Sequence, residues 1–239
     1  MSEAIFRDLS GMAEFNAAEE LQRIVWGTDD TPDPADLMMV IQKEGGLVAG
    51  AFVDGVLKAY VFGFPTNEPH VQHSHRLAVH PDQRGGGLGV KLKWHQRDWC
   101  LQRGIELVRW TYDPMRHINA SLNIGRLGAV STTYHVDFYG QMAGINEGVA
   151  SDRLLAEWHL KSNRVAAFAA GQPPVLASGG RSARVQIGKD FDTLLSSDRQ
   201  KAGDERLRVR AAMTALLAQG YAVTGYDSMA ADYVLELPD

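Results

Sequence analysis

The stretch of residues 77–90, with the sequence LAVHPDQRGGGLGV, constrains this chain most, because an apolar run, a turn, a glycine cluster and a helical pattern follow one another. Glycine lacks a Cβ atom, so the backbone can turn tightly there and a ligand can approach its amides. The first N–H groups of a helix have no partner within it, and they lie at the positive end of its dipole. A helix that opens at about Leu88 therefore predicts an anion site, and a phosphate is its natural guest.

Two common phosphate-binding motifs do not fit this stretch. A P-loop carries Lys followed by Ser or Thr straight after its last glycine, whereas Gly89 is followed by Val90. A dinucleotide-binding fingerprint needs a third glycine where Val90 stands. The pattern that fits is Arg-x-x-Gly-x-Gly, formed by Arg84, Gly87 and Gly89 and preceded by Leu-Ala-Val-His-Pro. A glycine-rich loop without a ligand is the alternative interpretation.

This pattern resembles the diphosphate-binding motif of the GCN5-related N-acetyltransferase (GNAT) superfamily. The resemblance implies acetyl-CoA or succinyl-CoA as the acyl donor and no metal. It also implies that the preceding strand and the glycine loop hold the cofactor, with the amides of Leu77 and Val79 next to the pantetheine arm. The full set of candidate cofactor-binding residues in this stretch is Leu77, Ala78, Val79, Arg84, Gly85, Gly86, Gly87, Leu88, Gly89 and Val90.

Composition narrows the class of protein. With 239 residues, of which 45% are hydrophobic, the chain can bury a full core. A net charge of -5 without a long basic block argues against nucleic acid or an acidic membrane surface as a partner. The lone Cys100 suits a reducing compartment, and the first residues lack the order of a signal peptide. We therefore expect a cytoplasmic protein.

Hydrophobic periodicity and turn residues predict an α/β (α+β) chain. Asp54-Gly55 between two apolar runs is a strong hairpin signal. We expect helices over residues 10–26, 35–43, 90–102, 119–127, 191–195 and 206–219. We expect strands over residues 4–9, 47–53, 56–64, 73–79, 105–112, 130–138, 153–160, 185–187, 221–226 and 232–237, and a loop over 140–148.

The resemblance implies the GNAT fold, in which a mixed central sheet is flanked by helices and its central strands splay apart to admit the pantetheine arm. These strands correspond to residues 73–79 and 105–112. After about residue 161, Pro- and Gly-rich stretches replace the regular pattern. We therefore expect a GNAT domain over residues 1–160 and a small α/β extension over 161–239, which packs on the core or on a partner. A homodimer is left open.

Transfer of an acyl group to an amine requires a base, because an ammonium group has no lone pair. By the resemblance, a position that carries a catalytic glutamate in some GNAT families falls on His73. Imidazole can accept a proton at neutral pH. His75, two residues further on the same strand face, is the alternative base. Pocket-lining roles without catalysis are the other interpretation of both histidines.

The general acid is harder to identify. GNAT proteins usually place a tyrosine four residues before a Leu-Gly pair that ends the helix, and here this position holds Ile124. Tyr134 is then our first candidate for the acid, and Tyr139 is the second. The alternative interpretation of Tyr134 is a packing role. Water could also protonate the thiolate. Asn119 occupies a position where the family often has an asparagine on the CoA arm, although an N-cap would look the same.

The resemblance extends to a bacterial GNAT subgroup of about this length that is often associated with N-acylamino acid racemases. It is carried by the residues of 112–114, 119–120, 127–130, 134, 137–140, 151–154 and 157–158. For such relatives a small amino acid is the implied acceptor. Arg153 could bind its carboxylate, unless it pairs with a neighbouring acid, and Trp26 could wall the acceptor pocket. A non-catalytic acyl-CoA sensor or assembly protein and a protein N-acetyltransferase are the alternative functions.

Overall fold

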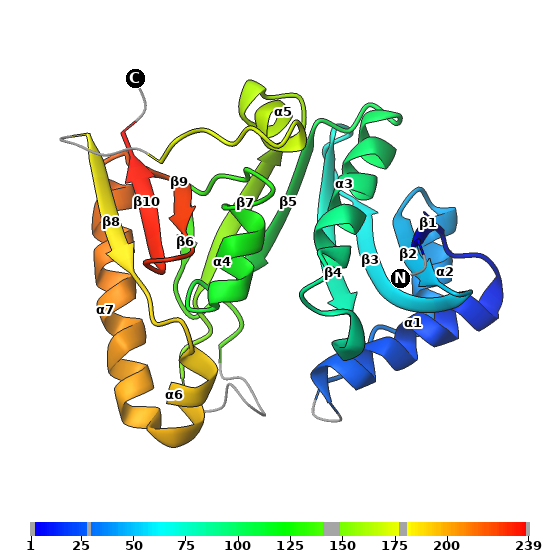
Figure 1. Ribbon diagram of the computed structural model, residues 1–239, viewed down its shortest axis with the longest axis horizontal. Helices are drawn as coiled ribbons and strands as arrows, with labels where there is room; N and C mark the ends of the chain where they lie inside the picture. Colours follow the sequence, from blue (N-terminus) through cyan, green and yellow to red (C-terminus); the bar gives the residue numbers. More distant parts are fainter. Residues whose placement is uncertain (1–2, 28–29, 141–148, 177–180, 238–239) are drawn as a thin grey trace. The chain divides into compact units, whose positions relative to one another are not determined.

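The computed structural model describes residues 3–27, 30–140, 149–176 and 181–237 (Figure 1). The chain forms two compact units, Met1–Arg109 and Trp110–Asp239. Residues 141–148 of the loop predicted over 140–148, and the Ser-Gly-Gly residues 178–180, lie outside the described residues. The predicted division of the chain near residue 160 stays a prediction.

The first unit is a sheet with helices on both faces (Figure 1). Its elements are β1 (Ile5–Asp8), α1 (Gly11–Trp26), α2 (Ala35–Lys43), β2 (Leu47–Val53), β3 (Val56–Pro65), β4 (Val71–Val79), the 3-10 turn η1 (Pro81–Gln83), α3 (Leu88–Leu101) and the start of β5 (Leu107–Tyr112). Strands β1 to β4 pair antiparallel in chain order, and β4 pairs with β5 in parallel. The predicted hairpin is confirmed, with Asp54 and Gly55 both at positive φ between β2 and β3.

The two faces of this sheet have different coverings. Helices α1 and α2 pack on one face through a buried cluster in which Phe15 and Met38 contact residues such as Tyr60 and Phe62 of β3. Helix α3 packs on the other face, where a Cβ atom added to Gly89 would lie 3.2 Å from Cγ2 of Val79. Gly89 is therefore required for the close approach of α3 to β4.

A β-bulge in β4 sets the direction of its side chains. The register with β3 pairs Gly63 with Ser74 and Phe62 with Arg76, so His75 is the extra residue. In such a bulge two residues oppose one partner, and the alternation of side chains shifts. His75 lies against the ring of Phe62, with 5.5 Å between ring centroids, on the face that α1 and α2 cover. Beyond the bulge Ala78 belongs to that same core cluster.

The second unit contains the rest of β5, α4 (His117–Asn123), β6 (Tyr134–His135), β7 (Arg153–His159), α5 (Asn163–Ala169), β8 (Ser182–Gln186), α6 (Phe191–Ser197), α7 (Arg199–Ala218), β9 (Ala222–Asp227) and β10 (Asp232–Glu236). The hydrogen-bonded order is β5-β7-β6, and β8, β10 and β9 form a separate sheet of three strands. Helix α7 contacts β8 of this small sheet (Figure 1). The predicted pairing of the two terminal strands is confirmed.

Several predictions for the second unit differ from the structure. The strand predicted over 130–138 shrinks to β6 with isolated bridges at Val130 and Ser131, because a turn with Asp137 at φ 47° interrupts it. The helix predicted over 119–127 is α4, which begins two residues earlier and ends at Asn123, with turns through Leu127. Asn119 is therefore inside α4 rather than its N-cap.

Two helices were missed or shortened for identifiable reasons. Helix α5 was not predicted, although the side chain of Ser162 accepts a hydrogen bond from the N–H of Val165 as a proper N-cap. Helix α7 begins at Arg199, where Asp198 caps it, seven residues before the predicted start. The first two turns of α7 are strongly polar, so hydrophobic periodicity does not reveal them.

The buried ion pair between Asp113 and Arg206 predicts a large effect on stability. The guanidinium donates to both carboxylate oxygens, at 3.1 and 2.8 Å. We expect Asp113→Ala to lower the free energy of unfolding by about 3–5 kcal/mol, because a buried cation is left unpaired. Urea unfolding checks this, with Arg184→Ala as the control, since its ion pair with Asp227 is exposed and worth about 0–1 kcal/mol. Equal effects of both substitutions would contradict the assignment.

Candidate cofactor and acceptor sites

A row of backbone N–H groups without acceptors begins the proposed cofactor site. The N–H of Arg84 donates to the carbonyl of Pro81, and the N–H of Lys91 donates to the carbonyl of Gly87. Between them, from Gly85 to Val90, no amide has a hydrogen-bond acceptor among the residues that the structure describes. These donors lie at the N-terminus of α3, where the helix dipole is positive. The geometry suits a group with several anionic oxygens, such as a diphosphate.

Glycine is needed in this row for backbone conformation and for access. Gly85 and Gly87 have φ values of 82° and 76°, in the left-handed region, and Gly87 is the N-cap of α3. Gly86 has an ordinary φ, and a Cβ atom there would lie 3.6 Å from its nearest neighbour, the carbonyl oxygen of Gln83. A side chain at position 86 would therefore fit the fold but would cover the amides.

Polar contacts anchor the turn before this row. The Nζ of Lys58 on β3 donates to Asp82 at 2.6 Å, and the Nδ1 of His80 lies 2.6 Å from the same carboxylate. The side-chain hydrogen bond from Lys58 is the main cause that lowers the pKa of Asp82. The loop is thus held at its strand end, while its amides remain available.

The amides of β4 alternate between the edge that faces β3 and the opposite edge, and their contact with a pantetheine arm stays a prediction. The N–H of His80 donates to the carbonyl of Lys58, toward β3. Because successive amides of a strand alternate in direction, those of Leu77 and Val79 point to the opposite edge. Among the described residues, the register of β4 with β5 ends at the pair His73 and Arg109. The edge from Ser74 to Val79 can therefore accept an extended ligand as an added strand.

His73 lies at the end of the paired segment and is partly buried. Its ring stacks on that of Phe64, with 4.9 Å between centroids. Burial lowers the pKa of His73 to about 4, and repulsion from His75, Arg109 and Lys93 contributes in the same direction. The imidazole is therefore neutral at physiological pH, but it is a weak base.

His75 has a carboxylate partner that sequence reasoning missed. Its Nε2 lies 3.2 Å from Oδ1 of Asp33, in the segment between α1 and α2. Arg76 lies beside it, 3.1 Å from Oδ2 of Asp33 and 2.5 Å from Asp30, with its guanidinium over the ring of Trp26. Trp26 therefore lies beside Arg76, and its role as a wall of the acceptor pocket stays a prediction. No sequence pattern links position 33 to position 75, so the pair could not be found from spacing.

The face of β4 toward α3 carries a second polar group. The buried Lys93 donates to Oγ of Ser74 at 3.0 Å, and Gln96 donates to Gln72 at 2.7 Å. Burial lowers the pKa of Lys93 to about 7. Lys93 and Gln96 were predicted from the sequence only as part of the helix over residues 90–102, because nothing in the periodicity indicates that a lysine on α3 is buried.

Comparison with known proteins adds the family. Residues 12–120 match the sequence profile described as the acetyltransferase (GNAT) family. The matched segment, which is just under half of the chain, is similar to this family. No curated protein sequence is significantly similar to the chain. The match spans the glycine row, β4 and the first residues of α4, so it covers the region on which the predicted cofactor site depends.

Solved structures show the same GNAT fold at low identity. The ribosomal-protein-S18-alanine N-acetyltransferase from Escherichia coli has 18% identity and a TM-score of 0.55, covering 67% of this chain and 96% of its own. An N-acetyltransferase from Staphylococcus aureus Mu50 has 15% identity and a TM-score of 0.55, covering 67% and 100%. A phosphinothricin acetyltransferase from Sinorhizobium meliloti, in complex with acetyl-CoA, has 16% identity and a TM-score of 0.52, covering 64% and 86%. The predicted fold class is confirmed.

The second unit contains the other predicted site residues. The hydroxyl of Tyr134 donates to Asp152 at 2.7 Å, and Arg210 donates to both oxygens of that carboxylate. Burial and the contact with Asp152 raise the pKa of Tyr134. The Nη1 of Arg153 donates to the carbonyl of Asp152 at 2.8 Å. A catalytic role for Tyr134 and a substrate-binding role for Arg153 stay predictions, as does the role of Asn119 on α4.

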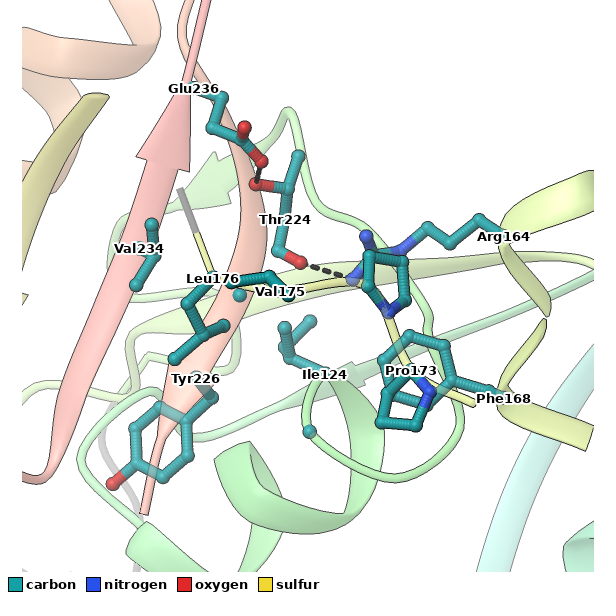
Figure 2. A pocket seen from close by; sticks show the side chains of 13 residues that line it. Ile124, Arg164, Phe168, Pro173, Val175, Leu176, Thr224, Tyr226, Val234 and Glu236 are labelled. Atoms are coloured by element: carbon teal, nitrogen blue, oxygen red, sulfur yellow. Dashed lines mark hydrogen bonds between the residues drawn. The ribbon is translucent and has the colours of Figure 1, made fainter. Parts of the chain in front are cut away.

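Ile124, which replaces the usual family tyrosine, has a packing role. It is fully buried and lines a cavity of about 250 Å³ within the second unit, together with Phe168, Arg164 and Thr224 (Figure 2). Arg164 donates to the carbonyls of Gly128 and Thr224. The side chain at position 124 thus contributes to the packing of α5 and β9 rather than offering a hydroxyl.

Within the described ranges, no group of three or more His, Cys, Asp or Glu side chains converges as a metal site would require. The described helices include none with the combined length and apolar character that crossing a bilayer demands.

The open position of Gly86 gives a test of the cofactor loop. We expect Gly86→Val to weaken acetyl-CoA binding by about 10-fold or more, because charged hydrogen bonds to the covered amides are lost. Its free energy of unfolding should stay near that of the wild type. Calorimetric titration measures the affinity. Gly104→Ala, at the other end of α3 with φ 72°, is the control: it should cost about 1–2 kcal/mol of stability and leave affinity unchanged. Unchanged affinity in Gly86→Val would contradict the loop assignment.

The pKa of His73 predicts a pH-dependent stability. Its folded-state pKa of about 4 lies below the ordinary 6.5, so between these values the unfolded chain binds a proton that the folded chain does not. The stability that neutral His73 contributes is therefore present above pH 6.5 and is lost as pH falls toward 4. The variant His73→Phe keeps a ring against Phe64 but has no imidazole. Between pH 7 and pH 5, we expect its free energy of unfolding to fall by about 1 kcal/mol less than that of the wild type. Urea unfolding at both pH values checks this, and identical losses would contradict the burial of His73.

Proposed function

We propose that this protein is a GNAT acetyltransferase that moves an acetyl group from acetyl-CoA to the primary amine of a small molecule, with an amino acid as the expected acceptor. The observation that supports the proposal best is the row of amides from Gly85 to Val90 without acceptors at the N-terminus of α3. Such a row suits a diphosphate, and acetyl-CoA carries one. Succinyl-CoA has the same diphosphate and remains the alternative donor.

The residues of the first unit fit the donor along its length. The loop amides would hold the diphosphate, with Arg84 beside them. The free edge of β4, from Ser74 to Val79, would pair with the pantetheine arm through the amides of Leu77 and Val79. At a rise of roughly 3.3 Å per residue this edge spans about 20 Å, which brings the far end of an extended arm to the two histidines.

The chemistry then needs a proton acceptor and a stabiliser of negative charge. Acetyl-CoA supplies the thioester when it is bound. His73 or His75 would take a proton from the acceptor's ammonium group, so that the free amine can attack. A backbone N–H near Val79 would stabilise the charge that develops on the carbonyl oxygen. A thiol has an ordinary pKa of about 8.5, so the departing thiolate can take its proton from water.

An amino acid acceptor is supported by the sequence resemblance to the subgroup that is associated with N-acylamino acid racemases. Trp26, which is partly exposed beside Arg76, would form part of the acceptor wall. We propose a cytoplasmic location, as the sequence predicts. A homodimer is the proposed alternative to a monomer.

The proposal predicts thiol release that depends on an amine. We expect the purified chain to bind acetyl-CoA in calorimetry and to release CoA thiol when a panel of free amino acids and small primary amines is added. The acylated product should be detected by mass spectrometry. The Gly86→Val variant serves as the control, because it should lose thiol release together with affinity.

Three results would change this assignment. Binding of acetyl-CoA without thiol release for any amine or peptide would favour a sensor or assembly protein. Turnover of peptides alone, with inactivity toward every small amine, would favour a protein N-acetyltransferase. Absence of binding to both acetyl-CoA and succinyl-CoA in well-folded material would end the proposal.

A further inference from the structure

We propose that Asp33 is a positioning residue that holds His75 as the base for the acceptor amine, and that His73 lines the site without taking the proton. This inference rests on the proposed function and deepens it. Sequence reasoning placed His73 first and His75 second, and it did not involve Asp33. The structure supplies four independent observations that favour the pair of Asp33 and His75.

The first observation is the way in which Asp33 is fixed. Its N–H donates to Oε1 of Gln22 at 2.8 Å, and its carbonyl accepts from Nε2 of the same side chain at 3.2 Å. Gln22 lies on α1 and is buried. Both backbone groups of Asp33 are thus held by one buried amide. A carboxylate on a fixed backbone can orient its partner with little loss of side-chain freedom.

The second observation is the geometry of the pair itself. Oδ1 of Asp33 lies 3.2 Å from Nε2 of His75. A carboxylate accepts only, so Nε2 carries the proton and Nδ1 keeps the lone pair of the neutral ring. The carboxylate also stabilises the imidazolium that forms when Nδ1 takes a proton. This division of roles is the one by which an acid residue orients a catalytic histidine in other enzymes.

The third observation concerns the other oxygen of Asp33. Oδ2 lies 3.1 Å from Nε of Arg76, whose Nη1 contacts Asp30 and whose Nη2 donates to the carbonyl of Thr31. The bulge in β4 is what places His75 and Arg76 side by side toward this segment. The charged and titratable groups around His75 are therefore Asp33, Arg76 and His73, with the rings of Phe62 and Phe64 as apolar walls.

The fourth observation is the hydroxyl of Tyr60, next to the same charged groups. Tyr60 is fully buried, and its hydroxyl has no hydrogen-bond partner among the residues that the structure describes. Burial raises the pKa of this hydroxyl, and the charges of Arg76 and Asp33 act on it as well. A buried hydroxyl is costly without a partner, so this one can serve a polar group that binds there. This points to a ligand at the pair rather than to a purely structural cluster.

His73 is less suited to the same task. It is stacked on Phe64, no carboxylate contacts it in the described structure, and three positively chargeable groups disfavour its protonation. His75 has an exposed ring and a carboxylate behind it. In the proposed step, a proton passes from the acceptor ammonium to Nδ1 of His75, and the amine forms the new C–N bond as the C–S bond breaks. The nitrogen then loses a second proton. Of the two protons, one reaches the departing thiolate, from His75 or through water, and the other goes to solvent, so the whole reaction releases one proton per ammonium consumed.

A double-mutant cycle tests the pair. Wild type, Asp33→Asn, His75→Gln and the double variant are compared with acetyl-CoA and the best acceptor of the amine panel at pH 7. We expect kcat/KM for the amine to fall by about 10-fold in Asp33→Asn and by about 100-fold in His75→Gln. The double variant should be within about 2-fold of His75→Gln, since the carboxylate acts only through the imidazole. Affinity for acetyl-CoA and the thermal midpoint should stay near wild type in all four.

The pH dependence separates a base from a structural role. At pH 9.5 a larger fraction of the acceptor is already neutral in solution, so the deficit of His75→Gln should shrink by several-fold relative to pH 7. Asp30→Asn is the matched control, because Asp30 contacts Arg76 but not His75, and it should stay within about 3-fold of wild type.

Three outcomes would overturn the inference. In the first, the losses of kcat/KM in Asp33→Asn and His75→Gln multiply in the double variant. In the second, the loss of kcat/KM in His75→Gln is the same at pH 7 and pH 9.5. In the third, Asp30→Asn loses as much kcat/KM as Asp33→Asn. Larger losses in His73→Gln than in His75→Gln would return the base to His73. If the wild type binds acetyl-CoA but turns over no amine, the proposed function fails instead, so the two failures can be distinguished.

Discussion

The single bulge in β4 is the constraint on which the arrangement of the first unit depends. Up to the bulge, the side chains of Gln72 and Ser74 face α3, and those of His73 and His75 lie on the face that α1 and α2 cover. After the bulge, Ala78 belongs to the core cluster under α1 and α2, while Val79 packs against α3. Without the extra residue, the alternation of a strand would send Arg76 to the α3 face and away from Asp33.

The bulged strand β4 carries both the histidines proposed to act on the acceptor and the amides proposed to bind the cofactor. The shifted phase directs the amides of Leu77 and Val79 to the free edge and the apolar side chains of the same residues toward Gly89 of α3. Close packing at Gly89 then fixes where the helix N-terminus begins. The amide row of the loop and the histidines are therefore held by the same strand, and the rigidity of that strand determines the distance between them.

What could be predicted from the sequence is what short stretches determine. Local backbone conformation determines three such features: the glycine loop, the hairpin at Asp54 and Gly55, and the start of α3. Each depends on φ values and on the absence of Cβ atoms, and neighbouring residues in the sequence indicate both. The cofactor candidates follow from that local geometry together with a family resemblance. The single-face placement of His73 and His75 also follows from the period of a strand.

What could not be predicted depends on contacts between distant residues. The clamp of Gln22 on Asp33, the pair of Asp33 with His75 and the burial of Lys93 against Ser74 each join residues that no spacing rule connects. In the second unit, Asp137 at positive φ cuts the predicted strand, and a polar first half conceals the start of α7. Burial also changes the chemistry of single residues. His73 was the first candidate for the base, but desolvation lowers its pKa and makes it a weak base.

The same reasoning bears on the general acid. The hydroxyl of Tyr134 donates a hydrogen bond to Asp152, and Arg210 donates two further hydrogen bonds to that carboxylate. Burial and the neighbouring carboxylate raise the pKa of Tyr134, so loss of its proton would leave two negative oxygens in contact. An acid must lose a proton easily, and a thiolate needs little help to leave. The contacts of Tyr134 therefore favour a structural role, which leaves proton return to water or to the imidazolium of His75.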